Sequence, residues 1–308
     1  MSVLVSVICA TFNHKDFIRP CLDGLVMQET TFEYEILVND DASTDGTAAI
    51  VREYAARYPD KIKAVLQQEN QYSKGVEISL GILYPMARGK YIAECEGDDY
   101  WTHPGKLQMQ VNYLERHPEC PLCYTKAHLF DHPSGTFRQE HLGFPYKGFE
   151  AMLSINPVPA MTACFRREAL ERYIQEVNPL SHHWATADYP KWLFFAQLGP
   201  LGFIDEFTGV YRDKSPASIS NPRNFGKRYA FLESVYDIKL FFAKRGGCYD
   251  KMARLLQSEQ EKACIEEATK YGSLWRAWGF LLKARCLTRW ERTIYRRTLL
   301  KAMLHGTS

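Results

Sequence analysis

Carboxylates gather in two short clusters in the N-terminal third of the chain. The first cluster is Asp40-Asp41, and the second is Glu96 followed by Asp98 and Asp99. Carboxylates brought to one place repel one another unless a cation or hydrogen-bond donors compensate their charge. Their oxygens suit Mg²⁺ or Mn²⁺, and these cations suit a diphosphate. The residue types therefore predict a site in which the acids hold a divalent cation and the cation holds a pyrophosphate group.

The predicted secondary structure places both clusters at strand ends. Continuous apolar runs indicate buried parallel strands at 3–9, 34–38, 62–66 and 90–95. Amphipathic stretches between them indicate helices, the first of which Asp16 could cap. Ligands of open α/β sheets bind beyond the carboxyl ends of the strands, so the two clusters and the run Thr11 to Asn13 should share one edge. Each cluster alone would also fit an exposed turn, since Asp, Ser and Gly favour turns.

The order of these elements predicts an α/β fold with a mostly parallel sheet flanked by helices. Residues 121–212 mix the two patterns, with expected strands at 122–125 and 161–165, a helix at 187–198 and a strand pair within 202–212. Beyond residue 220 the pattern is helical to the end. We therefore expect an α/β domain at 1–220 and a helical extension at 221–308.

Three spaced motifs resemble family 2 glycosyltransferases with the GT-A fold. They are VSVICATFN from Val5, EILVNDDASTDGT from Glu35 and GKYIAECEGDDYW from Gly89. The resemblance covers residues 1–215 and is closest to bacterial members that build surface polysaccharide, lipopolysaccharide or capsule. It implies transfer of a sugar from a UDP- or dTDP-linked donor to an acceptor hydroxyl, with inversion at the anomeric carbon and Mn²⁺ or Mg²⁺ as cofactor.

The same resemblance assigns roles to individual residues. Those that match donor-binding positions of the family are Thr11, Asn13, Asp40, Asp41, Glu96, Asp98 and Arg212. Among them, Asp41 matches the acid that accepts a hydrogen bond from the base N3–H, and Arg212 could contact the diphosphate. Asp99 matches the metal ligand. For Arg212 a surface ion pair is the alternative.

Asp188 lies in a later motif, Thr186 to Trp192, and resembles the catalytic base of the family. It falls at the start of the expected helix, where the helix dipole favours a carboxylate. An ionised Asp is a weak base, but it suffices when the transition state is oxocarbenium-like and the acceptor proton leaves late. A plain helix cap is the alternative for Asp188. For the whole chain, the alternative is a non-catalytic protein that binds nucleotide sugars or serves as a scaffold.

The C-terminal segment 271–308 is strongly basic, although the whole chain has a net charge of only +2. It holds eight Lys or Arg residues and one acid, Glu291, with Trp275, Trp278, Trp290 and Tyr295 among them. Basic and aromatic residues on a helix suit an anionic membrane, which fits a glycan or lipid-linked glycan as acceptor. A solvated helix packed on the α/β domain is the alternative. No nucleic-acid reading module accompanies the charge, so we expect no nucleic acid as partner.

The sequence also indicates a location. The N-terminal apolar run has no basic stretch ahead of it and does not predict a signal peptide. No segment offers about 20 uninterrupted apolar residues. Nine cysteines, an odd number without a framework, indicate reduced thiols. We therefore expect a cytoplasmic protein that is peripheral at the inner face of the cytoplasmic membrane.

Overall fold

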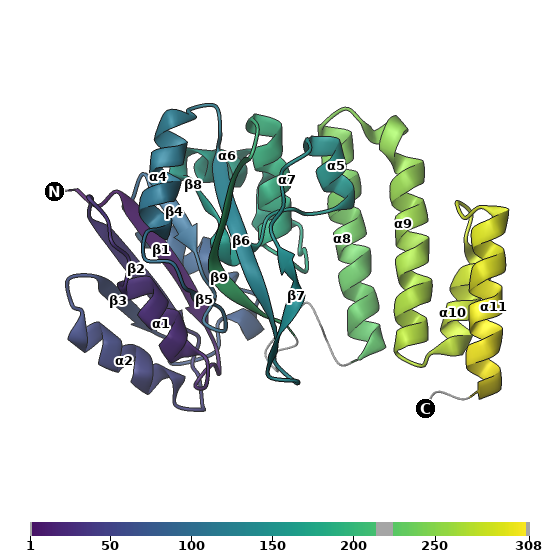
Figure 1. Ribbon diagram of the computed structural model, residues 1–308, viewed down its shortest axis with the longest axis horizontal. Helices are drawn as coiled ribbons and strands as arrows, with labels where there is room; N and C mark the ends of the chain where they lie inside the picture. The colour runs from purple at the N-terminus through teal and green to yellow at the C-terminus, as the bar shows by residue number, and fades with distance from the viewer. Residues whose placement is uncertain (1, 214–223, 306–308) are drawn as a thin grey trace. The chain divides into compact units, whose positions relative to one another are not determined.

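The computed structural model of the protein describes residues 2–213 and 224–305 (Figure 1). The chain divides into two compact units. The sheet unit comprises the described residues of 2–148, 156–182 and 194–213, and the helical unit comprises those of 149–155, 183–193 and 224–305. The expected boundary at residue 220 lies outside the described residues, so the division into 1–220 and 221–308 stays a prediction.

A nine-stranded mixed sheet forms the centre of the sheet unit. Its strand order is β3-β2-β1-β4-β8-β6-β9-β5, and β7 pairs with β6. The strands are β1 (Val5–Thr11), β2 (Tyr34–Asp40), β3 (Ile62–Leu66), β4 (Tyr91–Glu94), β5 (Tyr100–Trp101), β6 (Leu122–Asp131), β7 (Thr136–Leu142), β8 (Cys164–Arg166) and β9 (Gly202–Asp213). The first four strands pair in parallel, as expected from their continuous apolar runs. The predicted α/β fold is confirmed.

Helices pack against this sheet and close its core. They are α1 (Ile18–Val26), α2 (Thr47–Arg57), α3 (Tyr84–Met86), α4 (Lys106–Arg116) and α6 (Arg167–Val177). Short helical turns lie at Tyr72–Lys74, Ser79–Leu83, Ala160–Thr162 and Pro179–Ser181. Apolar side chains of β1, β2 and β4 meet those of α1, α2 and α4 in one buried cluster. This core fixes where the strands end, and therefore where the polar loops that follow them lie.

The helical unit contains α5 (Phe149–Ser154), α8 (Phe225–Arg245), α9 (Tyr249–Lys270), α10 (Leu274–Lys283) and α11 (Arg289–His305), together with the start of α7 (Asp188–Leu198). Helix α8 packs against α9, α9 against α10, and α10 against α11. Leu281 and Leu299 lie in the apolar cluster that these helices share. The helical pattern predicted beyond residue 220 is confirmed for residues 224–305.

Several local expectations were wrong. Asp16 does not cap α1, because the helix begins at Ile18 and the amides of Phe17 and Ile18 donate to the carbonyl oxygen of His14. The expected strand pair within 202–212 is the single strand β9, which β6 and β5 flank on its two sides. The expected strand at 161–165 begins only at Cys164. Strand pairing with distant partners, which local sequence does not encode, decides the last two cases.

None of the nine cysteines forms a disulfide bond in the structure, and eight of them are buried. Within residues 2–213 and 224–305, none of the helices combines the length and the apolar character that a membrane span requires.

Candidate active site

The ends of β1 and β2 lie side by side and hold the first group of predicted residues. The strand register pairs Thr11 with Asp40, and the amide of Asp41 donates to the carbonyl oxygen of Thr11 at 3.0 Å. Asn13 adopts a positive φ of 54° just beyond β1. Its side-chain oxygen accepts from the amide of Thr44 at 2.9 Å, so the loop after β1 is tied to the loop after β2.

Asp40 and Asp41 are both buried, but their carboxylates have different surroundings. The two oxygens of Asp41 accept hydrogen bonds from the amides of Gln71 (2.7 Å) and Tyr72 (3.0 Å). Asp41 therefore anchors the polar loop after β3. One oxygen of Asp40 accepts from the amide of Ser43 at 3.1 Å, and its other oxygen has no hydrogen-bond partner among the described residues. A carboxylate oxygen without a donor is costly to bury, which suits a position that faces a ligand.

The loop after β4 carries the second acidic cluster. Asp99 is 4% exposed, and the backbone amide of Arg212 donates to its Oδ1 at 2.8 Å. Burial raises the pKa of the Asp99 carboxyl well above its ordinary value, and the negative charges of Asp98 and Glu96 raise it further. Arg212 reaches Asp99 because β5 pairs with the end of β9. This loop therefore concentrates negative charge that a cation could neutralise.

The Arg212 guanidinium lies among three aromatic rings. Its central carbon is 4.7 Å from the ring centroid of Tyr100, 5.3 Å from that of Phe17 and 5.8 Å from that of Phe130. Its buried Nε has no hydrogen-bond partner among the described residues. Aromatic faces attract a guanidinium without using its donors. The rings thus hold the Arg212 cation close to Asp99 and leave donors for an anion.

His14 belongs to this group, although sequence reasoning did not select it. It is 8% exposed, and its Nδ1 has no hydrogen-bond partner among the described residues. Burial lowers the pKa of His14, while the charges of Asp98, Asp45 and Asp40 act in the opposite direction. Asp40 ends β2, and Asp45 and Asp98 lie in the loops after β2 and β4, so the structure brings both acidic clusters near the end of β1. The one sequence signal for His14 was its position next to Asn13.

Gly97 provides the contact between the loop after β4 and the end of β1. Its amide donates to the carbonyl oxygen of Ala10 at 3.0 Å. A Cβ at this position would lie 2.5 Å from Oγ1 of Thr11 and 2.8 Å from Nδ1 of His14, both of which are buried. No side chain fits there, so the acidic loop can approach β1 only because residue 97 is glycine.

We expect Gly97→Ala to destabilise the protein by about 1–3 kcal/mol, because the added methyl group must push apart two buried segments. Chemical denaturation would measure this loss. Gly279→Ala on α10 is the matched control, since a Cβ there meets nothing within 4 Å. Equal unfolding free energies for the two alanine variants would contradict the tight contact.

Asp188 is the first residue of α7 and lies in the helical unit. The Thr186 hydroxyl donates a hydrogen bond to its carboxylate. The next residue, Tyr189, is buried and donates through its hydroxyl to the carbonyl oxygens of Met152 (2.9 Å) and Leu153 (3.2 Å). The start of α7 is thus fixed to α5. This arrangement holds a half-buried carboxylate at a helix N-terminus, where the helix dipole favours its charged form.

Comparison with known proteins identifies the family of the chain. Residues 6–174 match the model of the family described as Glycosyl transferase family 2, and the chain belongs to that family. The uncharacterized protein Rv1520 of Mycobacterium tuberculosis is 38% identical over 208 residues, or 68% of this chain. The chain spans only 58% of the length of that relative. TuaG of Bacillus subtilis, which is named for teichuronic acid biosynthesis, is 25% identical over 82% of this chain and 95% of its own.

A solved structure shares the fold. The mannosyltransferase PcManGT of Pyrobaculum calidifontis, in complex with GDP-Man and Mn²⁺, is 20% identical and superposes with a TM-score of 0.56. The alignment covers 100% of this chain and 89% of that one. The GT-A fold expected from the motifs is therefore confirmed.

Proposed function

We propose that this protein is an inverting glycosyltransferase of surface polysaccharide, lipopolysaccharide or capsule synthesis. It moves a sugar from a UDP- or dTDP-linked donor to a hydroxyl of a glycan or lipid-linked glycan. The observation that carries the proposal is the meeting of the ends of β1 and β2 with the loop after β4, which brings Asp40, Asp45 and Asp98 near His14. The name of TuaG and the nucleotide sugar bound to PcManGT support it.

The donor nucleotide lies at the ends of β1 and β2 in this proposal. The loop of Thr11 and Asn13 lies under the nucleotide, and Asp41 accepts a hydrogen bond from the base. Each Asp41 oxygen already accepts one backbone hydrogen bond but has a second lone pair available. Glu96 and Asp98 contact the ribose.

The diphosphate then lies between Arg212 and Asp99. The donors of Arg212 that its aromatic neighbours leave free can bind phosphate oxygens. No group of three or more His, Cys, Asp or Glu side chains in the described part of the chain could hold a metal ion. Mg²⁺ and Mn²⁺ are commonly held by one or two carboxylates together with substrate phosphates. Asp99, with Asp98 beside it, would hold the ion, which when bound neutralises the charge that develops on the departing diphosphate.

Asp188 acts as the general base in this proposal. It accepts the proton of the acceptor hydroxyl as that oxygen attacks the anomeric carbon from the face opposite the diphosphate. The configuration of the sugar therefore inverts. The hydrogen bond from Thr186 orients the Asp188 carboxylate. If Asp188 only caps α7, it contributes to stability and not to turnover.

A panel of nucleotide sugars tests the donor assignment. We expect UDP- or dTDP-sugars with Mn²⁺ to raise the melting temperature by a few degrees, since a ligand that binds the native state stabilises it. GDP-mannose serves as the comparison. Stabilisation by GDP-mannose alone would contradict the proposed pyrimidine donor. Slow release of free sugar from the stabilising donor, without acceptor, would separate an enzyme from a non-catalytic nucleotide-sugar-binding protein.

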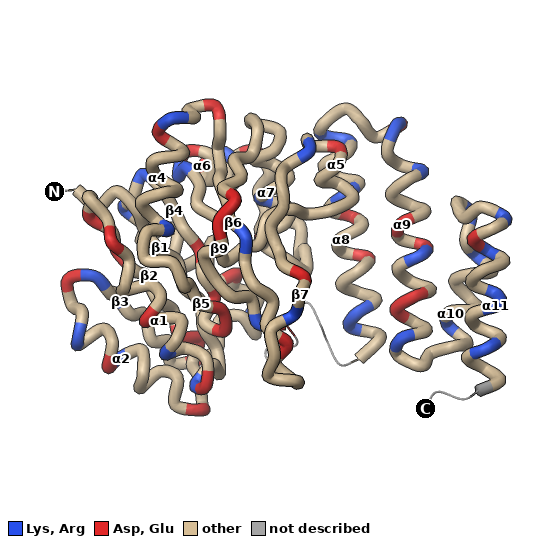
Figure 2. Tube along the Cα trace, in the orientation of Figure 1, with Lys and Arg blue, Asp and Glu red and all other residues tan. Residues whose placement is uncertain are grey.

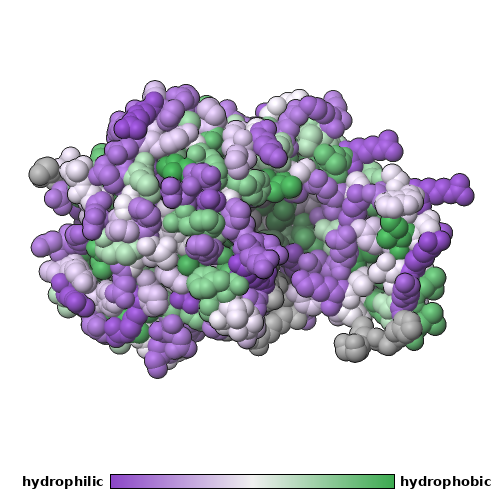
Figure 3. Space-filling view, in the orientation of Figure 1, coloured by the Kyte–Doolittle hydropathy of each residue, from purple (hydrophilic) through white to green (hydrophobic). Residues whose placement is uncertain are grey.

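We also propose that the exposed faces of α10 and α11 bind a membrane surface. Large apolar side chains stand in solvent there, with Trp275 85%, Trp290 73% and Leu304 80% exposed. Exposed basic residues lie among them, including Arg297 and Lys301, as the blue segments of α10 and α11 in Figure 2 and the mixed green and purple surface in Figure 3 illustrate. On α11, helical spacing puts residues 290, 294, 297, 301 and 304 on one side of the helix.

The exposed charged side chains of α10 and α11 are basic. The one acid of segment 271–308, Glu291, pairs with Lys262 at 2.5 Å and accepts from the amide of Thr288. Not every predicted residue faces outward, because Arg292 donates to carbonyl oxygens of Ala284 and Leu287, and the Tyr295 hydroxyl donates to Glu266. A surface of exposed Trp, Leu and basic side chains suits anionic lipid headgroups. It would hold the enzyme near a lipid-linked acceptor at the cytoplasmic membrane face.

We expect the protein to sediment with vesicles that contain phosphatidylglycerol and to remain in solution with phosphatidylcholine vesicles. The double variant Arg297→Gln/Lys301→Gln should bind the anionic vesicles roughly tenfold or more weakly, since each basic residue near the surface contributes about 1 kcal/mol. Arg52→Gln/Arg57→Gln on α2 removes the same charge from another exposed helix and should bind as the wild type does. Equal binding by all three proteins would contradict the membrane surface.

A further inference from the structure

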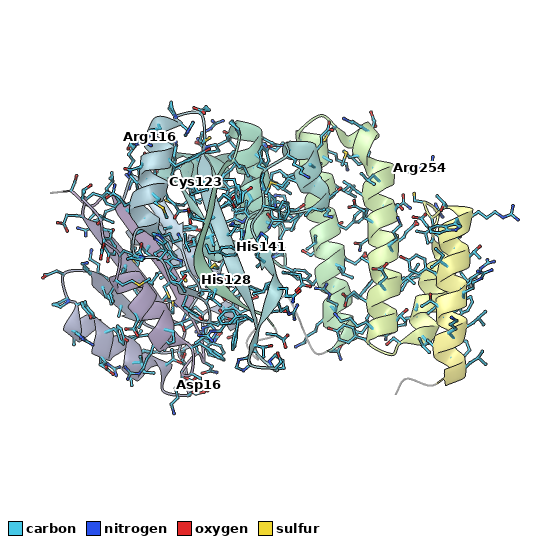
Figure 4. All side chains as sticks on the ribbon, viewed as in Figure 1. Asp16, Arg116, Cys123, His128, His141 and Arg254 are labelled. Atoms are coloured by element: carbon cyan, nitrogen blue, oxygen red, sulfur yellow. The ribbon has the colours of Figure 1, made fainter. Side chains whose placement is uncertain are left out.

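Aromatic and imidazole rings lie on one side of the strands β6, β7 and β9, where His128, Phe137 and His141 are exposed. The ring platform, as we name this surface, consists of His128, Phe130, Phe137, His141 and Phe207. The antiparallel register of β6 and β7 pairs His128 with His141 and Phe130 with Phe137. Figure 4 labels the two histidines on these strands. Residues far apart in the chain therefore form one surface within the sheet unit.

The rings of the platform contact one another in a continuous series. His128 stacks on Phe207 with centroids 4.1 Å apart and planes 8° apart, and His141 meets the same ring at 5.4 Å. Phe137 contacts both His128, at 6.0 Å, and Phe130, at 5.2 Å. Phe137 is 57% exposed, and both histidines are exposed. Exposed rings in contact with one another mark a binding surface more often than scattered single residues do.

Hydrogen-bonding groups lie among these rings. Lys126 has its Nζ 4.4 Å from the Phe207 ring centroid and 2.6 Å from a carboxylate oxygen of Asp205. The imidazoles of His128 and His141 add further nitrogen donors and acceptors. A surface that combines aromatic faces with such groups suits a saccharide, whose C–H faces stack on rings and whose hydroxyls form hydrogen bonds. A purely apolar partner would cover the imidazoles of His128 and His141 without giving them hydrogen-bond partners.

The platform is continuous with the proposed donor site. Strands β6 and β9 pair Phe130 with Arg212, and the Arg212 guanidinium lies 5.8 Å from the Phe130 ring centroid. The backbone amide of the same Arg212 binds Asp99. A glycan chain whose reacting hydroxyl meets the donor sugar near Asp99 would find the ring platform along β6. We infer that the ring platform binds the sugar units of the acceptor glycan, an inference that rests on the proposed function.

Saturation-transfer NMR with the methyl glycosides of glucose, galactose and N-acetylglucosamine tests this inference directly. At least one glycoside should receive magnetisation from the wild-type protein. His128→Ala/Phe137→Ala should bind that glycoside about tenfold more weakly, since each aromatic contact contributes severalfold to affinity. Ile174→Ala, which removes an exposed apolar side chain from α6, should bind as the wild type does. If the double variant folds poorly, the single variant Phe137→Ser takes its place and should also bind the glycoside more weakly than the wild type.

Two results would overturn the inference. One is that no glycoside binds the wild-type protein, and the other is that the platform variants bind the glycoside as tightly as Ile174→Ala. The thermal-shift assay with nucleotide sugars distinguishes a wrong platform assignment from a wrong proposed function, because binding of the donor does not require His128 or Phe137. Platform variants should therefore keep the thermal shift that the donor produces.

Discussion

Replacement of Asp99 by asparagine should lower sugar transfer by at least about a hundredfold. Asparagine keeps the size of the side chain and can still accept from the Arg212 amide through its oxygen, but it removes the negative charge. The variant would therefore lose the attraction for a divalent cation and, through it, for the diphosphate. Transfer would be measured as release of nucleoside diphosphate in the presence of acceptor, with Mn²⁺ supplied and then removed by a chelator.

Asp60→Asn is the control for this prediction, because Asp60 is an exposed acid in the turn before β3 and has no part in the site. It should transfer sugar at the wild-type rate. Wild-type activity should also vanish with the chelator and return with Mn²⁺ or Mg²⁺. The proposed role of Asp99 as metal ligand would be contradicted if Asp99→Asn retained a tenth or more of the activity. It would also be contradicted if the chelator left the wild-type activity unchanged.

Replacement of Asp188 by asparagine should lower the turnover number by roughly 10²- to 10⁴-fold, the usual contribution of a general base. Donor affinity should stay unchanged, because the proposed partner of Asp188 is the acceptor hydroxyl. The hydrogen bond from the Thr186 hydroxyl can persist to an amide oxygen, so the start of α7 should keep its structure. Steady-state kinetics with varied donor and varied acceptor would separate these effects.

Asp250→Asn provides a matched comparison for Asp188→Asn. Asp250 is also an acid in the first turn of a helix of the helical unit, and its loss changes the same dipole interaction without a catalytic role. The Asp250→Asn variant should have the turnover number of the wild-type enzyme. Equal, small reductions in the two variants, with equal losses of stability, would identify Asp188 as a helix cap and not a base.

The parts of the fold that sequence predicted are those with local signals. The strands β1 and β2 are buried on both faces and appear as continuous apolar runs, and Asp40 and Asp41 lie where β2 ends. The start of α7 at Asp188 likewise follows from a local pattern. These residues needed no knowledge of distant pairing, since ligand sites of α/β sheets lie beyond strand ends.

Other features depend on contacts between distant segments, and the sequence did not reveal them. Arg212 binds Asp99 only because the two-residue strand β5 pairs with β9, a contact between residues 113 positions apart. His14 has no motif of its own, and Gly97, from a segment more than 80 residues away, approaches it closely. The ring platform depends on the register of β6 with β7 and β9, which is set by tertiary packing and not by local propensity.

Calorimetric titration of UDP and dTDP into the protein, with Mn²⁺ and with a chelator, tests the central claim most directly. We expect one of these nucleotides to bind the wild-type protein tightly with Mn²⁺ and at least about tenfold more weakly with the chelator, the factor that corresponds to 1.4 kcal/mol. Asp99→Asn should bind weakly under both conditions. Tight binding that is the same with and without Mn²⁺, and the same in Asp99→Asn, would contradict a carboxylate site that holds the donor through a cation.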